Sequence, residues 1–400
     1  MLDSPKMRLS ADLRQELEVA RSQTDQLFDL LDPAGLYDRP IPERNRMIFY
    51  LGHMEAFDWN QLGRRYLGAP SFHPTFDNLF ERGIDPEPGQ LPSDTPADWP
   101  ALDEVRSYNA QVRAKLDRLW EEIPRDRRQM VIEHRQMHAE TFAYMLHNLD
   151  IRKKRLQPQP PIPRTAPPEH QMITIPAGWA TLGRDHGDVF GWDNEFQEER
   201  IFVPEFRIRR YKVTNGQYLE YVREGGEAPF FWVPQDQGWK ERRMFDTVPL
   251  DLNAPVYVTR DQALAFARWK DKALPTEAQY HRAAFGTPGG EIEELPGGNL
   301  DFRFWDPLPV NATPHDVSHW GVEQLNGNGW EWTSTVFEPF EGFAAADYYP
   351  GYSADFFDGK HFVVKGASAR TAAQLTRRSF RNWYRSEYPY TYTGFRLVEN

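Results

Sequence analysis

The chain has 400 residues and a formal net charge of −12, which argues against a nucleic-acid partner because such binding requires clustered positive charge. The complete absence of cysteine excludes disulfides, thiolate metal sites, cysteine nucleophiles and iron–sulfur clusters. The sequence has neither a membrane-length apolar run nor an apolar signal region, so we expect no membrane partner and a cytoplasmic location.

Apolar residues recur with helical spacing from residue 8 to about residue 150. The four amphipathic segments that they mark begin near Leu13, Ile48, Leu102 and Val131. A short linker over residues 123–126 joins the third segment to the fourth, whereas residues 68–100 form a long connection rich in Pro, Asp and Gly. The pattern predicts a four-helix bundle over residues 1–156, with a long connection that has a function or crosses the bundle.

Three histidines in these segments suggest a metal site. His134 and His138 have i, i+4 spacing in the fourth segment, and His53 lies in the second. The spacing places both imidazoles of the pair on one face of a helix, and a facing helix can supply the third. Ligation by histidine suits Fe, Cu, Ni or Zn, with Glu133 and Glu140 as alternative ligands or as partners that orient the imidazoles.

The residue that follows the first histidine of the pair limits the chemistry. A helical zinc protease carries its glutamate base there, whereas this chain has Arg135. A metalloprotease is therefore not expected, and a zinc hydrolase is a less favoured alternative. Three imidazoles leave up to three positions open on a metal, which suits an iron that binds O2 and substrates together. In the absence of a metal, the histidines would be ordinary bundle residues.

A proline-rich linker over residues 157–168 marks the clearest domain boundary. Residues 169–400 then have short strands, many turns and frequent Gly and Trp, which is typical of an irregular α+β domain. We expect a strand over residues 172–178, a helix near residues 260–270, and Thr276 as the N-cap of a further helix.

Arginine and aromatic residues are concentrated in two motifs of this second half. Trp330 and Trp332 alternate with a polar residue, which is typical of two rings packed on one face of a strand. Farther along, Arg381 and Arg385 flank Trp383, and such a block can bind a carboxylate and a cation. The alternative interpretation is a packed sheet with surface arginines.

The second half resembles the formylglycine-generating (sulfatase-modifying) domain, whose scaffold is related to C-type lectin-like folds. The motifs that carry the resemblance, in chain order, are residues 173–178, 213–218, 274–278, 327–333 and 394–397. Formylglycine generation depends on active-site cysteines, so that activity is not expected in a chain without them.

With a DinB-like bundle before this domain, the chain resembles the iron-dependent sulfoxide synthases of ergothioneine and ovothiol biosynthesis. The matching signatures are residues 51–53, 134–140, 349–357 and 380–383. The resemblance implies a two-domain α+β protein, with a DinB-like four-helix bundle followed by a formylglycine-generating-enzyme-like domain. It also implies Fe(II) held by His53, His134 and His138, and three small-molecule substrates: hercynine, a thiol and O2.

The same resemblance implies roles for C-terminal residues. Asn382 and Trp383 correspond to part of the pocket for the histidine betaine. A tyrosine of this domain serves as a proton donor near the iron, and the candidates here are Tyr349 and Tyr352, ahead of Tyr348.

Three positions depart from the family pattern. Relatives that use γ-glutamylcysteine carry Asp and Arg where this chain has Tyr384 and Tyr388, and Met137 stands where relatives often have a Gln close to the bound imidazole. With Tyr390, these tyrosines favour a smaller or uncharged donor, such as free cysteine or the selenosugar of selenoneine synthases. A non-catalytic betaine-binding homologue is the alternative from another functional class.

Overall fold

The computed structural model describes residues 12–83, 90–187, 190–236 and 238–399, so residues 8–11 of the predicted first helical segment lie outside this part. The chain divides into two compact units, Met1–Pro158 and Gln159–Asn400. None of the helices in the described ranges is long and apolar enough to cross a membrane.

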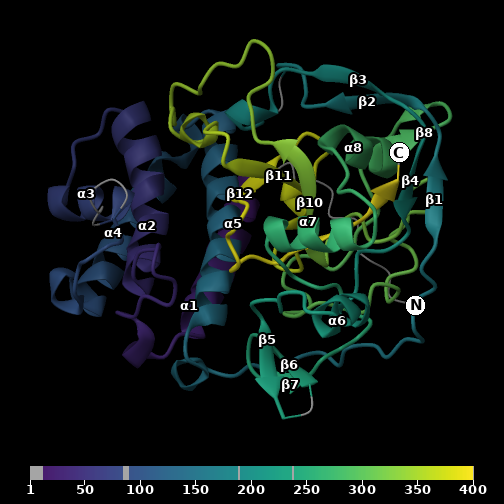
Figure 1. Cartoon of the computed structure of the whole chain (residues 1–400). Coiled ribbons are helices and arrows are strands. Elements are labelled where there is room, and N and C mark those ends of the chain that lie inside the picture. Colours follow the sequence, from purple (N-terminus) through teal and green to yellow (C-terminus); the bar gives the residue numbers. More distant parts are fainter. Residues whose placement is uncertain (1–11, 84–89, 188–189, 237, 400) are drawn as a thin grey trace. The chain divides into compact units, whose positions relative to one another are not determined.

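The N-terminal unit is helical, as the purple to blue part of Figure 1 shows. Its helices are α1 (Leu13–Asp29), α2 (Met47–Asp58), α3 (Pro74–Arg82), α4 (Leu102–Leu119) and α5 (Arg125–Asn148). A π-helical segment, Trp59–Tyr66, continues α2 directly. α1 packs against α5, and α2 packs against both α4 and α5, so the predicted helical N-terminal domain is confirmed.

Helix α3 lies inside the connection that was predicted as a loop. Pro74 begins it with a backbone angle suited to a first helical turn, and the His73 side chain accepts a hydrogen bond from a backbone N–H of that turn (3.2 Å). The buried Asp77 of α3 accepts a hydrogen bond from the Tyr108 hydroxyl (2.7 Å), and Asn60 Nδ2 donates to the Asp77 carbonyl (2.7 Å). These bonds attach α3 to α4 and to the π-helical segment.

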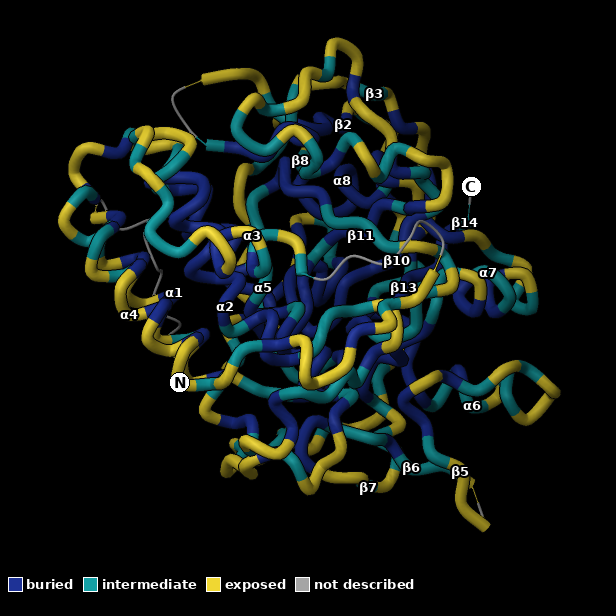
Figure 2. The backbone as a smooth tube through the Cα atoms, turned by 90° about the vertical axis from the view of Figure 1, so that its left-hand side faces the viewer, coloured by how far each residue is buried: buried dark blue, intermediate teal, exposed yellow. Residues whose placement is uncertain are grey.

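Helices α2 and α5 are buried along most of their length, as their dark blue tube in Figure 2 shows. Within the N-terminal unit α2 packs against α3, α4 and α5, so it lies at the centre of that unit. Polar side chains on the facing sides of these two helices therefore meet in a desolvated environment.

The C-terminal unit combines several small sheets with three described helices (Figure 1, teal to yellow). Its four-stranded sheet has the order β12-β11-β10-β13, in which β10 and β13 are parallel and the other neighbours are antiparallel. The strands of this sheet are β10 (Gly329–Val336), β11 (His361–Ala367), β12 (Asn382–Arg385) and β13 (Thr393–Phe395). β12 forms one edge of the sheet.

Short strands form four smaller sheets, with the orders β1-β4-β14, β2-β3, β5-β6-β7 and β8-β9. Their strands are β1 (Met172–Ile175), β2 (Gly178–Leu182), β3 (Glu199–Val203), β4 (Phe206–Arg209), β5 (Trp232–Gln235), β6 (Gly238–Arg242), β7 (Thr247–Pro249), β8 (Gly286–Thr287), β9 (Gly290–Glu291) and β14 (Val398–Glu399). The predicted α+β class of this domain is confirmed.

The helices of this unit are α6 (Asn215–Arg223), α7 (Arg260–Trp269) and α8 (Glu277–Phe285). The last two confirm the predicted helices, and Thr276 caps α8 by accepting a hydrogen bond from the Gln279 N–H (3.0 Å). Trp330 and Trp332 both lie on β10 and are buried, which confirms their structural role.

His281 of α8 makes the stability of this domain depend on pH. Burial lowers the pKa of His281 well below its usual range, and the nearby Lys365 and Arg378 lower it further. Below about pH 6.5 the unfolded chain therefore binds a proton that the folded chain does not bind, so the free energy of unfolding decreases as the pH falls.

When the pH is lowered from about 7.5 to 5, we expect the free energy of unfolding to decrease less in the His281→Asn variant than in the wild type. The difference between the two decreases should reach up to about 2 kcal/mol. Asparagine keeps a donor for the Thr181 carbonyl, which lies 3.0 Å from His281 Nδ1. Urea unfolding of both proteins at the two pH values measures this difference, and equal pH dependence would contradict the assignment.

Candidate metal centre and associated residues

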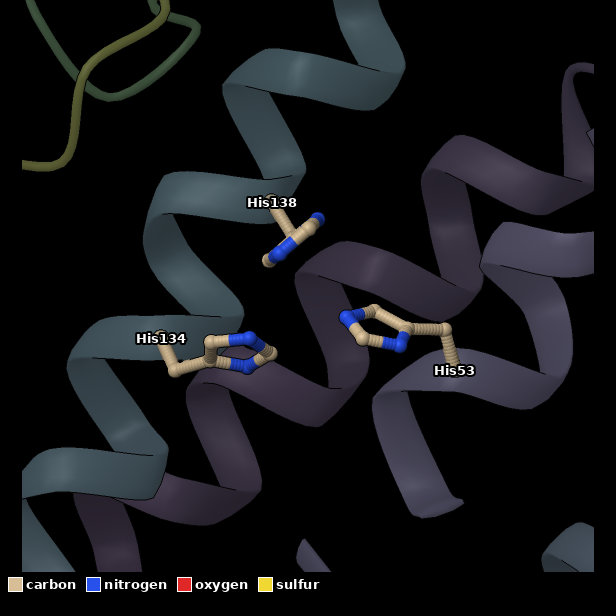
Figure 3. Close-up of side chains that lie close together, drawn as sticks. All are labelled: His53, His134 and His138. Atoms are coloured by element: carbon tan, nitrogen blue, oxygen red, sulfur yellow. The ribbon is translucent and has the colours of Figure 1, made fainter. Parts of the chain in front are cut away.

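The three predicted histidines come together inside the N-terminal unit. His53 lies on α2, and His134 and His138 lie one turn apart on α5. One ligand nitrogen from each ring lies within 4.8 Å of the other two, and Figure 3 shows the rings turned toward one another. Within the described ranges, no other group of three or more His, Asp or Glu side chains has this arrangement.

Burial keeps these imidazoles neutral. It lowers the pKa of His53 to about 4 and the pKa values of His134 and His138 well below the usual range, with mutual repulsion and Arg135 adding to the effect. A neutral imidazole offers a lone pair, which is the form that binds a metal. His138 Nδ1 is buried and has no hydrogen-bond partner among the described residues. The donor set therefore fits a divalent transition metal.

Neighbouring groups fix the orientation of two of these rings. His53 Nδ1 lies 2.7 Å from the Phe80 carbonyl oxygen of α3. Phe57 stacks on His134 with the ring centroids 3.4 Å apart and the planes 7° from parallel. Outer partners of this kind hold a metal-binding imidazole in one tautomer and one orientation. Sequence spacing did not identify Phe80 because it lies on the helix that was predicted as a loop.

Arg135, which stands where a zinc protease has its base, forms a buried ion-pair cluster. Its Nη2 donates to Glu55 Oε2 (2.9 Å) and to Asp58 Oδ2 (2.7 Å), both on α2. Arg113 Nε of α4 also donates to Glu55 (2.8 Å). Burial opposes the charge on Glu55, yet the two arginines outweigh it and lower the pKa of Glu55 to about 2. The cluster links the histidine-bearing helices.

In the C-terminal unit, the predicted residues fall into two groups on opposite faces of the edge strand β12. Trp383 belongs to an aromatic group, where it stacks on Phe337 (4.2 Å between centroids) and meets the edge of Tyr352 (5.5 Å). Tyr352 also stacks on the buried Trp192 (4.0 Å) and lies beside Tyr349 (5.8 Å). The two candidate tyrosines and Trp383 are therefore neighbours.

The second group contains the predicted donor-site tyrosines. Asn382 Nδ2 donates to the Tyr384 hydroxyl (3.2 Å), Tyr384 stacks on Tyr388 (6.1 Å), and Tyr388 contacts Tyr390 (5.1 Å). Successive side chains of a strand point to opposite faces, so Asn382 and Trp383 diverge.

The remaining predicted residues differ in accessibility. Arg381 is buried, and its Nε and Nη2 each lie 3.2 Å from the Glu277 carboxylate, with Nη1 donating to the Glu338 carbonyl (3.0 Å). Arg385 is exposed at the end of β12, and Met137 is half-buried on α5 next to His138. Arg385 is thus better placed than Arg381 to meet a ligand carboxylate.

Comparison with known proteins assigns both domains. Residues 16–147 match the DinB superfamily, and residues 158–400 match the Sulfatase-modifying factor enzyme 1-like domain. The chain is 31% identical to the protein named hercynine oxygenase of Mycolicibacterium smegmatis, with 96% of this chain and 98% of that protein covered.

Two fungal proteins named ergothioneine biosynthesis protein 1 each share 29% sequence identity with this chain, in alignments that cover 93% of it. The match covers 56% of the Neurospora crassa protein and 54% of the Schizosaccharomyces pombe protein, so the chain spans a little over half the length of these relatives. The two domain matches and the full-length bacterial relative show that the chain belongs to the hercynine oxygenase family of ergothioneine biosynthesis enzymes.

Proposed function

We propose that this chain is a nonheme Fe(II), O2-dependent synthase that joins a sulfur donor to the imidazole ring of hercynine as a sulfoxide. The observation that carries the proposal is the cluster of three neutral histidines in a chain that resembles a hercynine oxygenase along its full length. His53, His134 and His138 would hold the iron. When bound, Fe(II) supplies open coordination positions for O2 and the sulfur donor.

The overall reaction is balanced by one molecule of O2. A thiol and an imidazole C–H give a C–S bond and a sulfoxide, with one oxygen atom in the product and the other in water. The proton donor that this chemistry needs is one of Tyr349 and Tyr352, which are neighbours in the C-terminal unit. Tyrosine to phenylalanine variants at each position, assayed for sulfoxide yield, identify which one acts.

The betaine would be recognised at β12. A trimethylammonium group is stabilised against an aromatic face, which Trp383 and Tyr352 supply, and Asn382 offers an amide at the same edge. Arg385 would meet the carboxylate, because Arg381 is already paired with Glu277. By the family resemblance, Met137 is a further substrate-binding candidate, since relatives often have a Gln close to the bound imidazole at this position.

Tyr384, Tyr388 and Tyr390 would select the donor. Their rings contact one another in sequence, and Tyr384 and Tyr388 stand where γ-glutamylcysteine-using relatives carry Asp and Arg. A free cysteine would be the donor, and a selenosugar is the alternative donor, which would make the product selenoneine-type.

Mass spectrometry under air with the Fe(II)-loaded protein tests the proposal. Hercynine is supplied with cysteine, γ-glutamylcysteine and a selenosugar in competition, while O2 uptake is recorded. We expect a C–S or C–Se product together with O2 uptake, and neither when Zn(II) replaces Fe(II). Hercynine binding without product or O2 uptake for every donor would identify a binding module instead.

A further inference from the structure

We propose that Gly52 is a positioning residue for the metal, because the absence of a side chain lets Phe80 of α3 lie directly against α2. A Cβ atom at Gly52 would lie 2.4 Å from Phe80 Cδ1 and 2.5 Å from Phe80 Cγ, which is closer than carbon atoms approach. Gly52 immediately precedes His53, so the close approach occurs beside a ligand of the proposed iron. The inference rests on the proposed function for the identity of the bound group.

The close contact between Phe80 and α2 places the backbone carbonyl of Phe80 beside His53. The Phe80 carbonyl oxygen lies 2.7 Å from His53 Nδ1, and a carbonyl can only accept a hydrogen bond. Nδ1 therefore carries the hydrogen, and Nε2 keeps the lone pair that a metal requires. Figure 3 shows a ring nitrogen of His53 turned toward the other two histidines. The carbonyl of α3 thus selects both the tautomer and the orientation of this ligand.

Phe80 has little room to move away from a larger side chain. It is fully buried, and its ring packs against Phe76 (5.4 Å between centroids), Tyr108 (6.2 Å) and Trp99 (6.4 Å). Hydrogen bonds from Tyr108 and Asn60 to Asp77 also hold α3 in its position. A methyl group at position 52 is therefore expected to displace α3 as a unit and to withdraw the Phe80 carbonyl from His53.

Titration of the metal-free protein with Co(II), followed by visible absorption and calorimetry, tests this role without any substrate. We expect Gly52→Ala to weaken Co(II) binding by roughly 10- to 100-fold, as loss of an outer partner of a metal ligand usually does. The matched control is Gly63→Ala, since a Cβ there would lie 2.4 Å from Trp59 Cε3. Gly63 is also buried and helical, but its Cβ would meet Trp59 of its own helix rather than the residue that bonds His53, so its variant should bind Co(II) within about twofold of the wild type.

The Phe80→Ala variant keeps the carbonyl and removes the ring, so it makes the test independent of whether Gly52→Ala folds. In that background, adding Gly52→Ala should change Co(II) affinity by less than about threefold, because the clash is gone. A large loss in that background would overturn the inference, as would wild-type affinity in a folded Gly52→Ala protein or an equal loss in Gly63→Ala. Failure of the wild type to form product from hercynine would instead contradict the proposed function alone.

Discussion

The His138→Ala variant is expected to lose Fe(II) binding and turnover together. The proposed site consists of one imidazole from α2 and two from α5, and the variant leaves only two ligands in a desolvated environment. The affinity should fall by more than the roughly 10- to 100-fold that loss of an outer partner costs. Anaerobic Fe(II) titration of both proteins, with circular dichroism to verify the fold, measures the difference.

The chain offers a matched control for this experiment. His319 also has a histidine four residues away, at position 315, but both are exposed and lie in a turn-rich stretch of the C-terminal unit. His319→Ala should therefore bind Fe(II) as the wild type does. Equal iron binding by the His138→Ala protein and the wild type would remove the metal assignment.

The metal cluster was predictable because helical geometry alone determines most of it. An i, i+4 spacing in a segment with helical periodicity places His134 and His138 on one face, and bundle packing brings the facing helix within reach. Its supporting contacts were not predictable in the same way. Phe80 acts through its backbone carbonyl, which every residue has, and it lies in α3, whose apolar pattern is short and flanked by proline-rich sequence.

In the C-terminal domain, the partners of charged residues could not be predicted from the sequence either. The Arg-rich block left Arg381 and Arg385 both open as partners of a carboxylate, but the guanidinium of Arg381 is buried against Glu277, which is 104 residues away in the chain. Residue type does not reveal whether an arginine pairs inside the domain, because the partner is defined only by the tertiary fold. Strand alternation likewise separates Asn382 from Trp383, although they are adjacent in sequence.

Of the substitutions proposed for this chain, Arg135→Ala is expected to cause the largest decrease in the free energy of unfolding. Arg135 is 1% exposed and is bonded to Glu55 and Asp58, so its removal leaves two buried carboxyl groups without their shared cation. Breaking a buried ion pair from one side usually costs about 3–5 kcal/mol. Here Asp58 would lose the cation that is bonded to it, whereas Glu55 would keep its bond to Arg113. Urea unfolding of the metal-free protein should show a decrease of this size in the free energy of unfolding. Because no metal is bound in this experiment, the decrease contains no contribution from metal binding by the adjacent His134.

Two further variants determine whether the ion-pair cluster itself is responsible for this loss of stability. Arg152→Ala removes an arginine whose side chain is 85% exposed in its pair with Asp150, so it should leave the free energy of unfolding close to that of the wild type. Arg135→Lys keeps the positive charge but cannot bridge both carboxylates with a planar fork, and it should therefore recover only part of the stability. A loss below about 1 kcal/mol in Arg135→Ala would mean that water or neighbouring arginines replace Arg135, and that the cluster does not hold α2 against α5.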